Sequence, residues 1–305
     1  MHIIIGIWGI LRSLPYTIES IERFCFQPLR QHGYTYEIFM HTYSSLEPYE
    51  NARNGEMGRV NTSSWELLNP DYIFVENQDM FDRRIDYAKF ESNGDAWKNN
   101  FSSLKNHVRA LNSLLHLTEL IESTSKIRRV DSVIFLRPDV TFISELPVYL
   151  LSLFPNNTLF VPDFHRSCNG NEYNDRMAMG DVKSAVAYGN RLRFAAEYAR
   201  THKLHSEKFV YYYMNFVKRV NVIEIPFRFK RTRIHGNIAE RDKGIITPED
   251  ENLYMQLGLA PQAVPWYLRM FFRRNFFDYN STNIFCSPND RISSKTILKY
   301  KNVAT

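Results

Sequence analysis

A short apolar run that stops at a charged tripeptide is the feature that most constrains the fold. Residues 133–136 read Val-Ile-Phe-Leu, and Arg137, Pro138 and Asp139 follow directly. The apolar run is typical of a strand buried on both faces of a sheet. Proline has no amide hydrogen to give to a central ladder, so the strand should end near Arg137. Arg137 and Asp139 would then stand at its carboxyl end, where open α/β sheets bind their ligands.

Two interpretations of this Arg-Pro-Asp sequence are open from the residues alone. A guanidinium beside a carboxylate suits a ligand that carries phosphates and a metal ion, because the carboxylate holds the cation and the guanidinium neutralises oxygens. The same residues would also form an ordinary ion pair in a surface turn.

Composition predicts a globular protein. The chain has 305 residues, of which 44% are hydrophobic and 14% aromatic, enough for one large α/β domain or two small ones. No apolar run reaches the roughly 18 residues of a membrane span, and residues 3–11 are too short for a secretory signal. The three cysteines are far apart and have no CxxC or Cys/His spacing. This argues against a disulfide framework and a structural zinc site of that type, and it favours the cytoplasm.

The formal charge of +5 is a mild excess, and its placement is more informative than its size. Residues 228–235 alternate basic with other side chains, so a strand there would place a row of cations on one face. Such a row could neutralise a diphosphate. It also supports an alternative, a basic nucleic-acid-binding protein, although that leaves the polar loop 163–176 without a role.

Apolar runs alternate with helical periodicity along most of the chain. This pattern predicts an α/β fold with a mostly parallel sheet. The expected strands are 3–8, 36–42, 72–76, 133–136, 158–162 and 222–226, and the main helices are 17–29, 101–123, 182–201 and 209–217.

The first expected strand opens a strand-turn-helix unit that contains Gly9 and Arg12. Glycine lets the backbone approach a ligand, and Arg12 would stand near a helix N-terminus, where anions are favoured. The unit has no GxGxxG pattern and no Walker lysine, so neither a dinucleotide site nor a P-loop is supported. Arg109 and Ser113 lie four residues apart on a later helix and could reach one ligand together.

Four motifs in a fixed order resemble those of a known family. They are Gly9-x-x-Arg12, Arg109-x-Leu111-x-Ser113, Leu136-Arg137-Pro138-Asp139 and Asn174-Asp175-Arg176-Met177-Ala178-Met179-Gly180. In this combination the chain resembles, over roughly residues 1–235, nucleotide-sugar glycosyltransferases with a GT-A-type fold. Members of that family occur in bacteria and in large DNA viruses of algae, and they include viral xylosyltransferases that build capsid glycans.

The resemblance implies a fold and an activity. The fold is a GT-A-like α/β/α sandwich, with a catalytic domain at 1–245 and a helical C-terminal extension at 246–305 packed on it. The activity is transfer of a sugar, for example xylose, from a nucleotide diphosphate donor such as a UDP-sugar to a hydroxyl of a glycan acceptor. If the protein is viral, it would work in the host cytoplasm. A metal-dependent phosphoesterase or nucleotidyltransferase is the alternative enzyme class, and it would normally show clustered ligands for two metals.

The resemblance also implies site residues. Those expected to bind the donor are Gly9, Arg12, Arg109, Ser113, Arg137 and Asp139. Asp139 matches the last Asp of a DxD motif whose first Asp is replaced here by Arg137. Asp139 and a late histidine, His235, would therefore hold a divalent ion, Mn²⁺ or Mg²⁺.

The catalytic base needs a carboxylate near the acceptor hydroxyl. Asp175 is the first choice, because the polar loop that follows the expected strand 158–162 could project it over the sugar. Asp163 and Glu207 are its rivals. The alternative role of Asp175 is structural, as the cap of the helix that follows Gly180.

Overall fold

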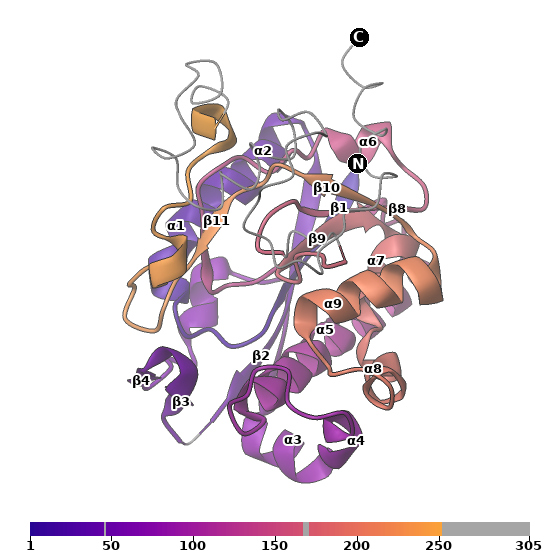
Figure 1. The fold of residues 1–305 in the computed structure, drawn as a ribbon. Helices are drawn as coiled ribbons and strands as arrows, with labels where there is room; N and C mark the ends of the chain where they lie inside the picture. The colour runs from indigo at the N-terminus through magenta and orange to yellow at the C-terminus, as the bar shows by residue number, and fades with distance from the viewer. Residues whose placement is uncertain (46, 167–170, 252–305) are drawn as a thin grey trace, which may run out of the picture.

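A computed structural model describes residues 1–45, 47–166 and 171–251 of the chain. It confirms the mixed α/β fold, in which a seven-stranded, mostly parallel sheet lies between layers of helices (Figure 1). The strand order is β10-β8-β9-β6-β1-β2-β5. The strands of this sheet are β1 His2–Trp8, β2 Thr35–Ser44, β5 Tyr72–Asn77, β6 Ser132–Leu136, β8 Thr158–Pro162, β9 Met177–Asp181 and β10 Asn221–Ile225.

Two further pairs of short strands lie outside this sheet. β7 Val140–Phe142 pairs with β11 Phe229–Arg231, and β3 Tyr49–Asn51 pairs with β4 Glu56–Gly58. The helices are α1 Leu14–Ile21, α2 Gln27–Gln31, α3 Gln78–Arg84, α4 Ala88–Glu91, α5 Ser102–Ile127, α6 Leu150–Leu153, α7 Val182–Gly189, α8 Leu192–Ala199 and α9 Ser206–Tyr212. Short 3-10 turns occur at Ala52–Asn54, Ser64–Leu68 and Glu240–Asp242, and π-helical turns at Glu22–Phe26 and Tyr213–Lys218.

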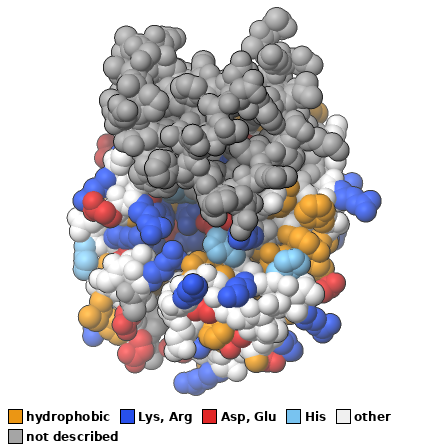
Figure 2. Space-filling model, in the orientation of Figure 1, with side chains coloured by type: hydrophobic (Ala, Val, Ile, Leu, Met, Phe, Trp, Pro, Cys, Tyr) orange, Lys and Arg blue, Asp and Glu red, His pale blue; other side chains and the backbone are white. Residues whose placement is uncertain are grey.

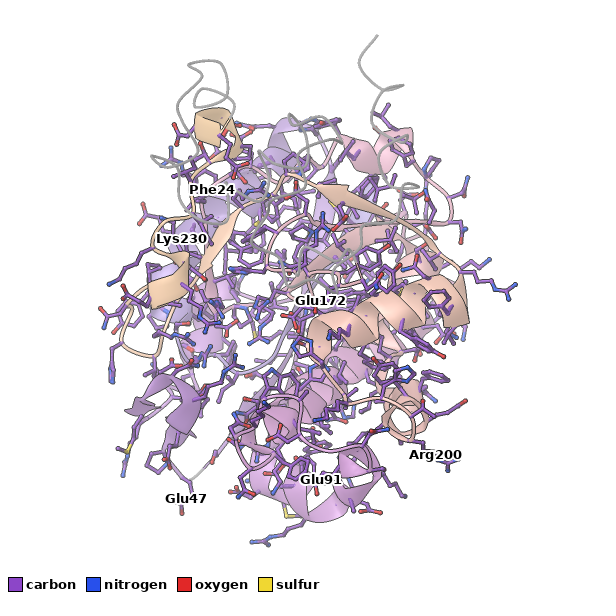
Figure 3. The ribbon with its side chains drawn as sticks, viewed as in Figure 1. Phe24, Glu47, Glu91, Glu172, Arg200 and Lys230 are labelled. Carbon is purple, nitrogen blue, oxygen red and sulfur yellow. The ribbon has the colours of Figure 1, made fainter. Side chains whose placement is uncertain are left out.

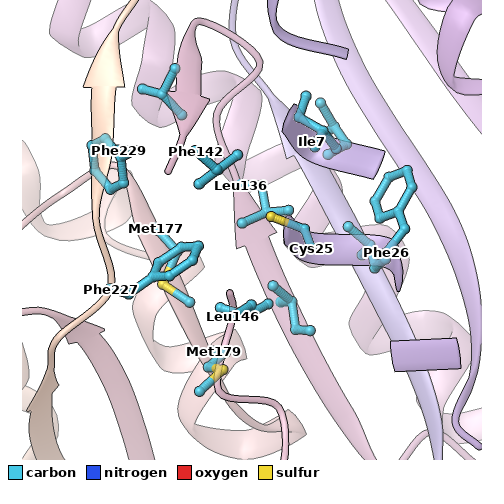
Figure 4. Close-up of a cluster of buried hydrophobic side chains, with 14 of the residues drawn as sticks. Ile7, Cys25, Phe26, Leu136, Phe142, Leu146, Met177, Met179, Phe227 and Phe229 are labelled. Atoms are coloured by element: carbon cyan, nitrogen blue, oxygen red, sulfur yellow. The ribbon is translucent and has the colours of Figure 1, made fainter. Parts of the chain in front are cut away.

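The central strands are apolar on both faces because each face supplies a separate core. Along β1, Ile5 and Ile7 pack into the core that contains α1, α2 and the β7–β11 pair, whereas Ile4 packs into the core of α5 and α7–α9. Figure 4 shows the first core, where Phe142, Phe227 and Phe229 meet the sheet. Gly6 faces the second core, and a Cβ there would lie 2.7 Å from the Phe135 ring. A residue with a side chain at position 6 would therefore displace that ring.

Four features of the fold were not predicted from the sequence. β9 pairs antiparallel with both β6 and β8 in an otherwise parallel sheet. The helix expected at 182–201 is broken into α7 and α8. The polar segment after β5 forms α3 and α4, and the long segment between β2 and β5 contains the β3–β4 hairpin.

The helical C-terminal extension expected at 246–305 lies mostly outside the described residues. Among the helices that the structure describes, none has the length and apolar character needed to cross a membrane.

The connections of β1 create the crevice that matters for function. Within the sheet, β2 and then β5 follow on one side of β1, whereas β6 lies on the other side of β1. At such a reversal the loops at the carboxyl ends of the strands separate, and ligands bind between them. In this chain the reversal lies between β1 and β6.

Candidate functional site

The strand register brings three segments to one edge of the sheet. Ile7 of β1 pairs with Leu136 of β6, and Leu136 pairs with Met177 of the antiparallel β9. The chain therefore leaves β1, leaves β6 and enters β9 at the same edge of the sheet. Around this point a cleft of about 400 Å³ opens at the carboxyl edge of the sheet.

Charged side chains dominate the lining of the cleft. Its arginines are Arg12, Arg53, Arg109, Arg137 and Arg176, and its carboxylates are Glu47, Glu50, Asp79, Asp82 and Asp175. Glu47 and Glu50 are exposed, and Figure 3 shows Glu47 far from the sheet, at the lower margin. In Figure 2, Lys and Arg side chains gather around a hollow on this face.

The positive charge at the strand ends is not fully neutralised. The pKa of Arg53 is lowered by partial burial and by the charges of Arg241, Arg231 and Arg176. The pKa of Arg233 is also lowered, by burial and by Arg12 and Arg231, although Glu56 acts in the opposite direction. A guanidinium becomes easier to deprotonate when the surrounding potential is positive, and the same potential attracts an anion.

Asp139 is the buried centre of the arginine cluster. Its Oδ1 accepts a hydrogen bond from Arg137 Nε at 2.8 Å, and its Oδ2 accepts from Arg137 Nη2 and Arg12 Nη2, both at 2.7 Å. Burial acts to raise the pKa of Asp139, but the two arginines hold it well below the usual range. The ionised carboxylate therefore fixes two guanidinium groups at the crevice, each in a planar, hydrogen-bonded geometry.

Aromatic rings support the same two arginines. The Arg137 guanidinium lies 5.2 Å from the centre of the Trp8 ring, and that of Arg12 lies 5.2 Å from the centre of Tyr49. Gly9, between β1 and Arg12, has φ +100°, a conformation that side-chain-bearing residues rarely adopt. This turn allows the chain to leave β1 while Arg12 returns to Asp139.

The residues expected to hold a divalent ion do not fit one in this arrangement. Both carboxylate oxygens of Asp139 already accept from guanidinium groups, and a cation there would be repelled by two positive charges. The His235 ring is exposed and contacts the backbone oxygen of Met57 at 3.0 Å. Within the described parts of the chain, the group of three side chains that could hold a metal lies elsewhere, at His41, Glu76 and His116.

Asp175 lies just before β9, at the same sheet edge as the Asp139 cluster. It is buried, and Arg176 Nη1 lies 3.1 Å from its Oδ1, an atom that has no well-directed hydrogen bond. Burial acts to raise the pKa of Asp175, but Arg176, His107 and Arg137 lower it overall. Asp175 therefore carries a negative charge at neutral pH inside the cleft. It does not cap the following helix, because the side chain that accepts from the first turn of α7 is Asp181.

His107 of α5 is the neutral neighbour of Asp175. Burial lowers its pKa to about 3, although Asp175 acts in the opposite direction. Its ring lies edge-on to Trp97, with ring centres 6.0 Å apart, and both residues line the cleft. This side of the cleft thus combines an ionised carboxylate, an uncharged imidazole and an aromatic ring.

The structure brings together some of the predicted site residues and separates others. Gly9, Arg12, Arg109, Arg137 and Asp175 line the cleft, whereas Asp139 lies directly behind it, bonded to Arg12 and Arg137. Arg109 is held on the opposite wall by Asp82, at 2.5 and 2.9 Å.

Three other candidates do not line the cleft. Ser113 is fully buried and accepts from the Gly9 backbone N–H at 2.8 Å, so it supports the turn from behind. Asp163 forms a salt bridge with the buried Arg228. Glu207 lies 3.4 Å from Arg176 and so reaches the cleft only through that arginine.

Two arginines of the cleft were not predicted as site residues. Arg176 is part of the Asn174-Asp175-Arg176 motif and adjoins the predicted base Asp175, and it reaches the lining because β9 runs antiparallel and begins at the functional edge. Arg53 lies in the 3-10 turn between β3 and β4, in a segment whose sequence predicts no fixed structure.

Comparisons with known proteins found no sequence match and a distant structural similarity. No protein-family profile matches the chain, and no curated protein sequence is similar to it. Among solved structures, the chain is similar to mouse xyloside xylosyltransferase 1 in its apo form, with 8% sequence identity and a TM-score of 0.37. That alignment covers 74% of this chain and 85% of the mouse chain.

Proposed function

We propose that the protein is a glycosyltransferase that moves a sugar from a nucleotide diphosphate donor to a hydroxyl of a glycan. The observation that carries this proposal is the crevice between β1 and β6, where Asp139 fixes Arg12 and Arg137 at the same sheet edge as the ionised Asp175. Sugar transfer from such a donor requires positive charge for the departing diphosphate and a base for the acceptor proton.

The arginines would bind the diphosphate. Arg12 and Arg137 present planar N–H groups held by one carboxylate, and the lining also includes Arg53 and Arg176. Guanidinium groups can donate two parallel hydrogen bonds to phosphate oxygens. Charge that develops on the leaving diphosphate would meet groups that are already oriented, which is the condition for effective electrostatic stabilisation.

Asp175 would accept the proton of the attacking hydroxyl. As the bond from the acceptor oxygen to the sugar carbon forms and the bond to the diphosphate breaks, the hydroxyl becomes acidic and its proton passes to the carboxylate. The lowered pKa keeps Asp175 ionised before the reaction. Trp97 lines the cleft and stacks on His205, with ring centres 5.4 Å apart, so it is an aromatic ring against which a sugar could pack.

The role of a divalent ion follows from the same geometry. Because both oxygens of Asp139 accept from arginines, we infer that Arg12 and Arg137 supply the positive charge that the last Asp of a DxD motif would obtain through a metal. No step of the proposed reaction passes through a bound ion.

The direct test is incubation of the protein with a panel of sugar nucleotides, UDP-xylose among them, in Mn²⁺ and in EDTA. The expected result is slow hydrolysis of one donor in both conditions, with a nucleoside diphosphate as product. Absence of hydrolysis and of nucleotide binding for every donor would refute the proposal. Activity that is lost in EDTA and restored by Mn²⁺ would refute the role assigned to the arginines.

The alternative functions have less support in the described residues. The three arginines of 228–233 are each paired with internal carboxylates, so they do not form a free surface for nucleic acid. A two-metal phosphoesterase would need clustered carboxylate and histidine ligands in the cleft. The described metal-ligand group, His41, Glu76 and His116, does not line it.

A further inference from the structure

Two histidines and a glutamate converge behind one wall of the cleft. His41 belongs to β2, Glu76 to β5 and His116 to α5, and one ligand atom from each lies within 4.8 Å of the others. The Nε2 atoms of His41 and His116 are 3.5 and 3.8 Å from Glu76 Oε2. The proposed reaction makes no use of these three residues.

The hydrogen bonds of Ser113 determine the proton position on His41. A serine hydroxyl has one proton to donate, and that of Ser113 is directed to the His41 backbone oxygen at 3.0 Å. Its oxygen accepts from the Gly9 N–H and can therefore only accept from His41 Nδ1, which is 2.9 Å away. We assign the proton to Nδ1, so that in the neutral ring the Nε2 lone pair faces Glu76.

With the proton on Nδ1, His41 Nε2 faces the Glu76 carboxylate without a hydrogen to donate. His41 is only 1% exposed, and its Nε2 has no hydrogen-bond partner. The nitrogen lone pair instead faces the Glu76 Oε2 atom, 3.5 Å away. Two electron-rich atoms that face each other in a buried site are unfavourable unless a cation lies between them.

Neighbouring groups hold the carboxylate in place. Arg84 Nη2 donates to Glu76 Oε1 at 2.6 Å, and the Asn112 amide donates to Oε2 at 2.8 Å. The Phe74 ring lies edge-on to both imidazoles, with ring centres 5.2 and 5.6 Å away. Hydrogen bonds to the ligands and an apolar surround are the features that orient and strengthen metal sites in proteins.

We propose that His41, Glu76 and His116 form a site for a divalent transition-metal ion of the Zn²⁺ class. Two imidazole nitrogens and one carboxylate oxygen are a common three-ligand set for zinc, whereas Mg²⁺ and Ca²⁺ prefer oxygen ligands. Metal–ligand distances of about 2.0–2.2 Å in a tetrahedral site place neighbouring ligand atoms about 3.4 Å apart. The observed separations from Glu76 Oε2, 3.5 and 3.8 Å, need to close by only a few tenths of an ångström.

Binding requires one local rearrangement. The two imidazoles are stacked, with ring centres 4.8 Å apart and planes at 5°, so their lone pairs run parallel instead of converging. The His116 side chain is 32% exposed, and rotation of its ring about χ2, a soft torsion, would direct its lone pair to the ion. Its exposed side leaves a fourth position open to water.

An ion at this site would tie together three elements that build the cleft. It would join β2, β5 and α5, and Ser113 connects His41 to the Gly9 backbone at the cleft's inner end. The ion would therefore stabilise a wall of the cleft without contacting the substrate. The proposal does not depend on the glycosyltransferase activity.

The test is calorimetric titration of chelator-treated full-length protein with ZnCl₂, together with thermal melting. We expect one ion per chain and a raised Tm in the presence of zinc. His116→Ala should weaken binding at least about 100-fold while the metal-free protein stays folded, since the residue is partly exposed. His202→Ala, at an exposed histidine of another region, is the matched control and should bind as the wild type does.

Two further variants keep the result unambiguous. Glu76→Gln retains an oxygen that can accept from Arg84 and should also weaken zinc binding, whereas Asp139→Asn should not. Equal affinity in wild type and His116→Ala, or no stoichiometric binding by the wild type, would overturn the proposal. Loss of binding in Asp139→Asn would overturn it as well, because it would place the ion in the cleft. None of these measurements uses a sugar nucleotide, so their outcome is separate from that of the proposed function.

Discussion

Two regions of this protein are rich in arginine, but they differ in how far neighbouring carboxylates neutralise the positive charge. In the cleft, Arg12 and Arg137 share Asp139, and Arg12 also lies 3.4 Å from Glu56, a carboxylate that pairs with Arg233 as well. In the segment 228–233, the buried Arg228 alone is paired with two carboxylates, Asp163 and Glu251. The first region keeps a surplus of positive charge at a sheet edge, whereas Arg228 and Arg231 of the second region are neutralised inside the fold.

The difference teaches that the number of arginines in a segment does not determine whether they can bind an anion. Arg231 donates to Asp242 at 2.6 and 2.8 Å, and Lys230 donates to the backbone oxygen of Lys243. Figure 3 places Lys230 at the left margin beside β11. The row of cations expected on one face of a strand at 228–235 is therefore a set of internal contacts. The cations available for a ligand lie at the strand ends.

The largest expected effect compares a carboxylate from each region. Asp175→Asn should lower kcat by about 10²–10⁴-fold in the folded protein, because the acceptor proton would lose its base, while nucleotide binding changes little. Asp163→Asn should do the reverse, with a lower free energy of unfolding and normal turnover in the folded protein. Steady-state kinetics and urea unfolding of both variants measure the contrast. Loss of turnover in Asp163→Asn alone would assign the base to Asp163.

The next effect concerns stability and compares two arginines. Arg228→Ala leaves Asp163 and Glu251 without their buried partner and should reduce the free energy of unfolding by about 3–5 kcal/mol. Arg53→Ala, at an exposed residue of the cleft, should change it by less than about 0.5 kcal/mol. Urea unfolding curves give both values. Equal effects would mean that the two regions do not differ as described.

Acid should lower the free energy of unfolding, because His107 beside the cleft is held uncharged in the folded protein. Its pKa is about 3 in the folded protein, below the value of about 6.5 in an unfolded chain. The unfolded state therefore binds more protons between these values, so stability is full above pH 6.5 and falls as the pH drops toward 3. From pH 6.5 to 5 the loss should be about 2 kcal/mol. His107→Gln should flatten this part of the pH profile, whereas His202→Gln should not.

The sequence predicted the fold where the signal was local. The apolar runs of β1 and β6 and the periodicity of α5 are properties of single segments, and the Arg-Pro-Asp sequence marked the end of β6 correctly. Pairing between distant segments could not be predicted in this way. The antiparallel direction of β9, the 65-residue separation of Arg228 and Asp163, and the convergence of His41, Glu76 and His116 depend on how whole elements pack.

The smallest expected effect tests the geometry of the arginines apart from their charge. Arg12→Lys retains a positive charge but loses the planar group that reaches both Asp139 and a phosphate oxygen, so UDP binding should weaken about 10–100-fold, or 1–3 kcal/mol. Arg231→Lys makes the same chemical change in the neutralised region, where the lost contact is to Asp242. That variant should bind UDP as the wild type does. Calorimetric titration of both variants decides the comparison: equal affinity in wild type and Arg12→Lys would show that the cleft offers only charge. Weakened binding in Arg231→Lys would show that the segment 228–233 takes part in the donor site after all.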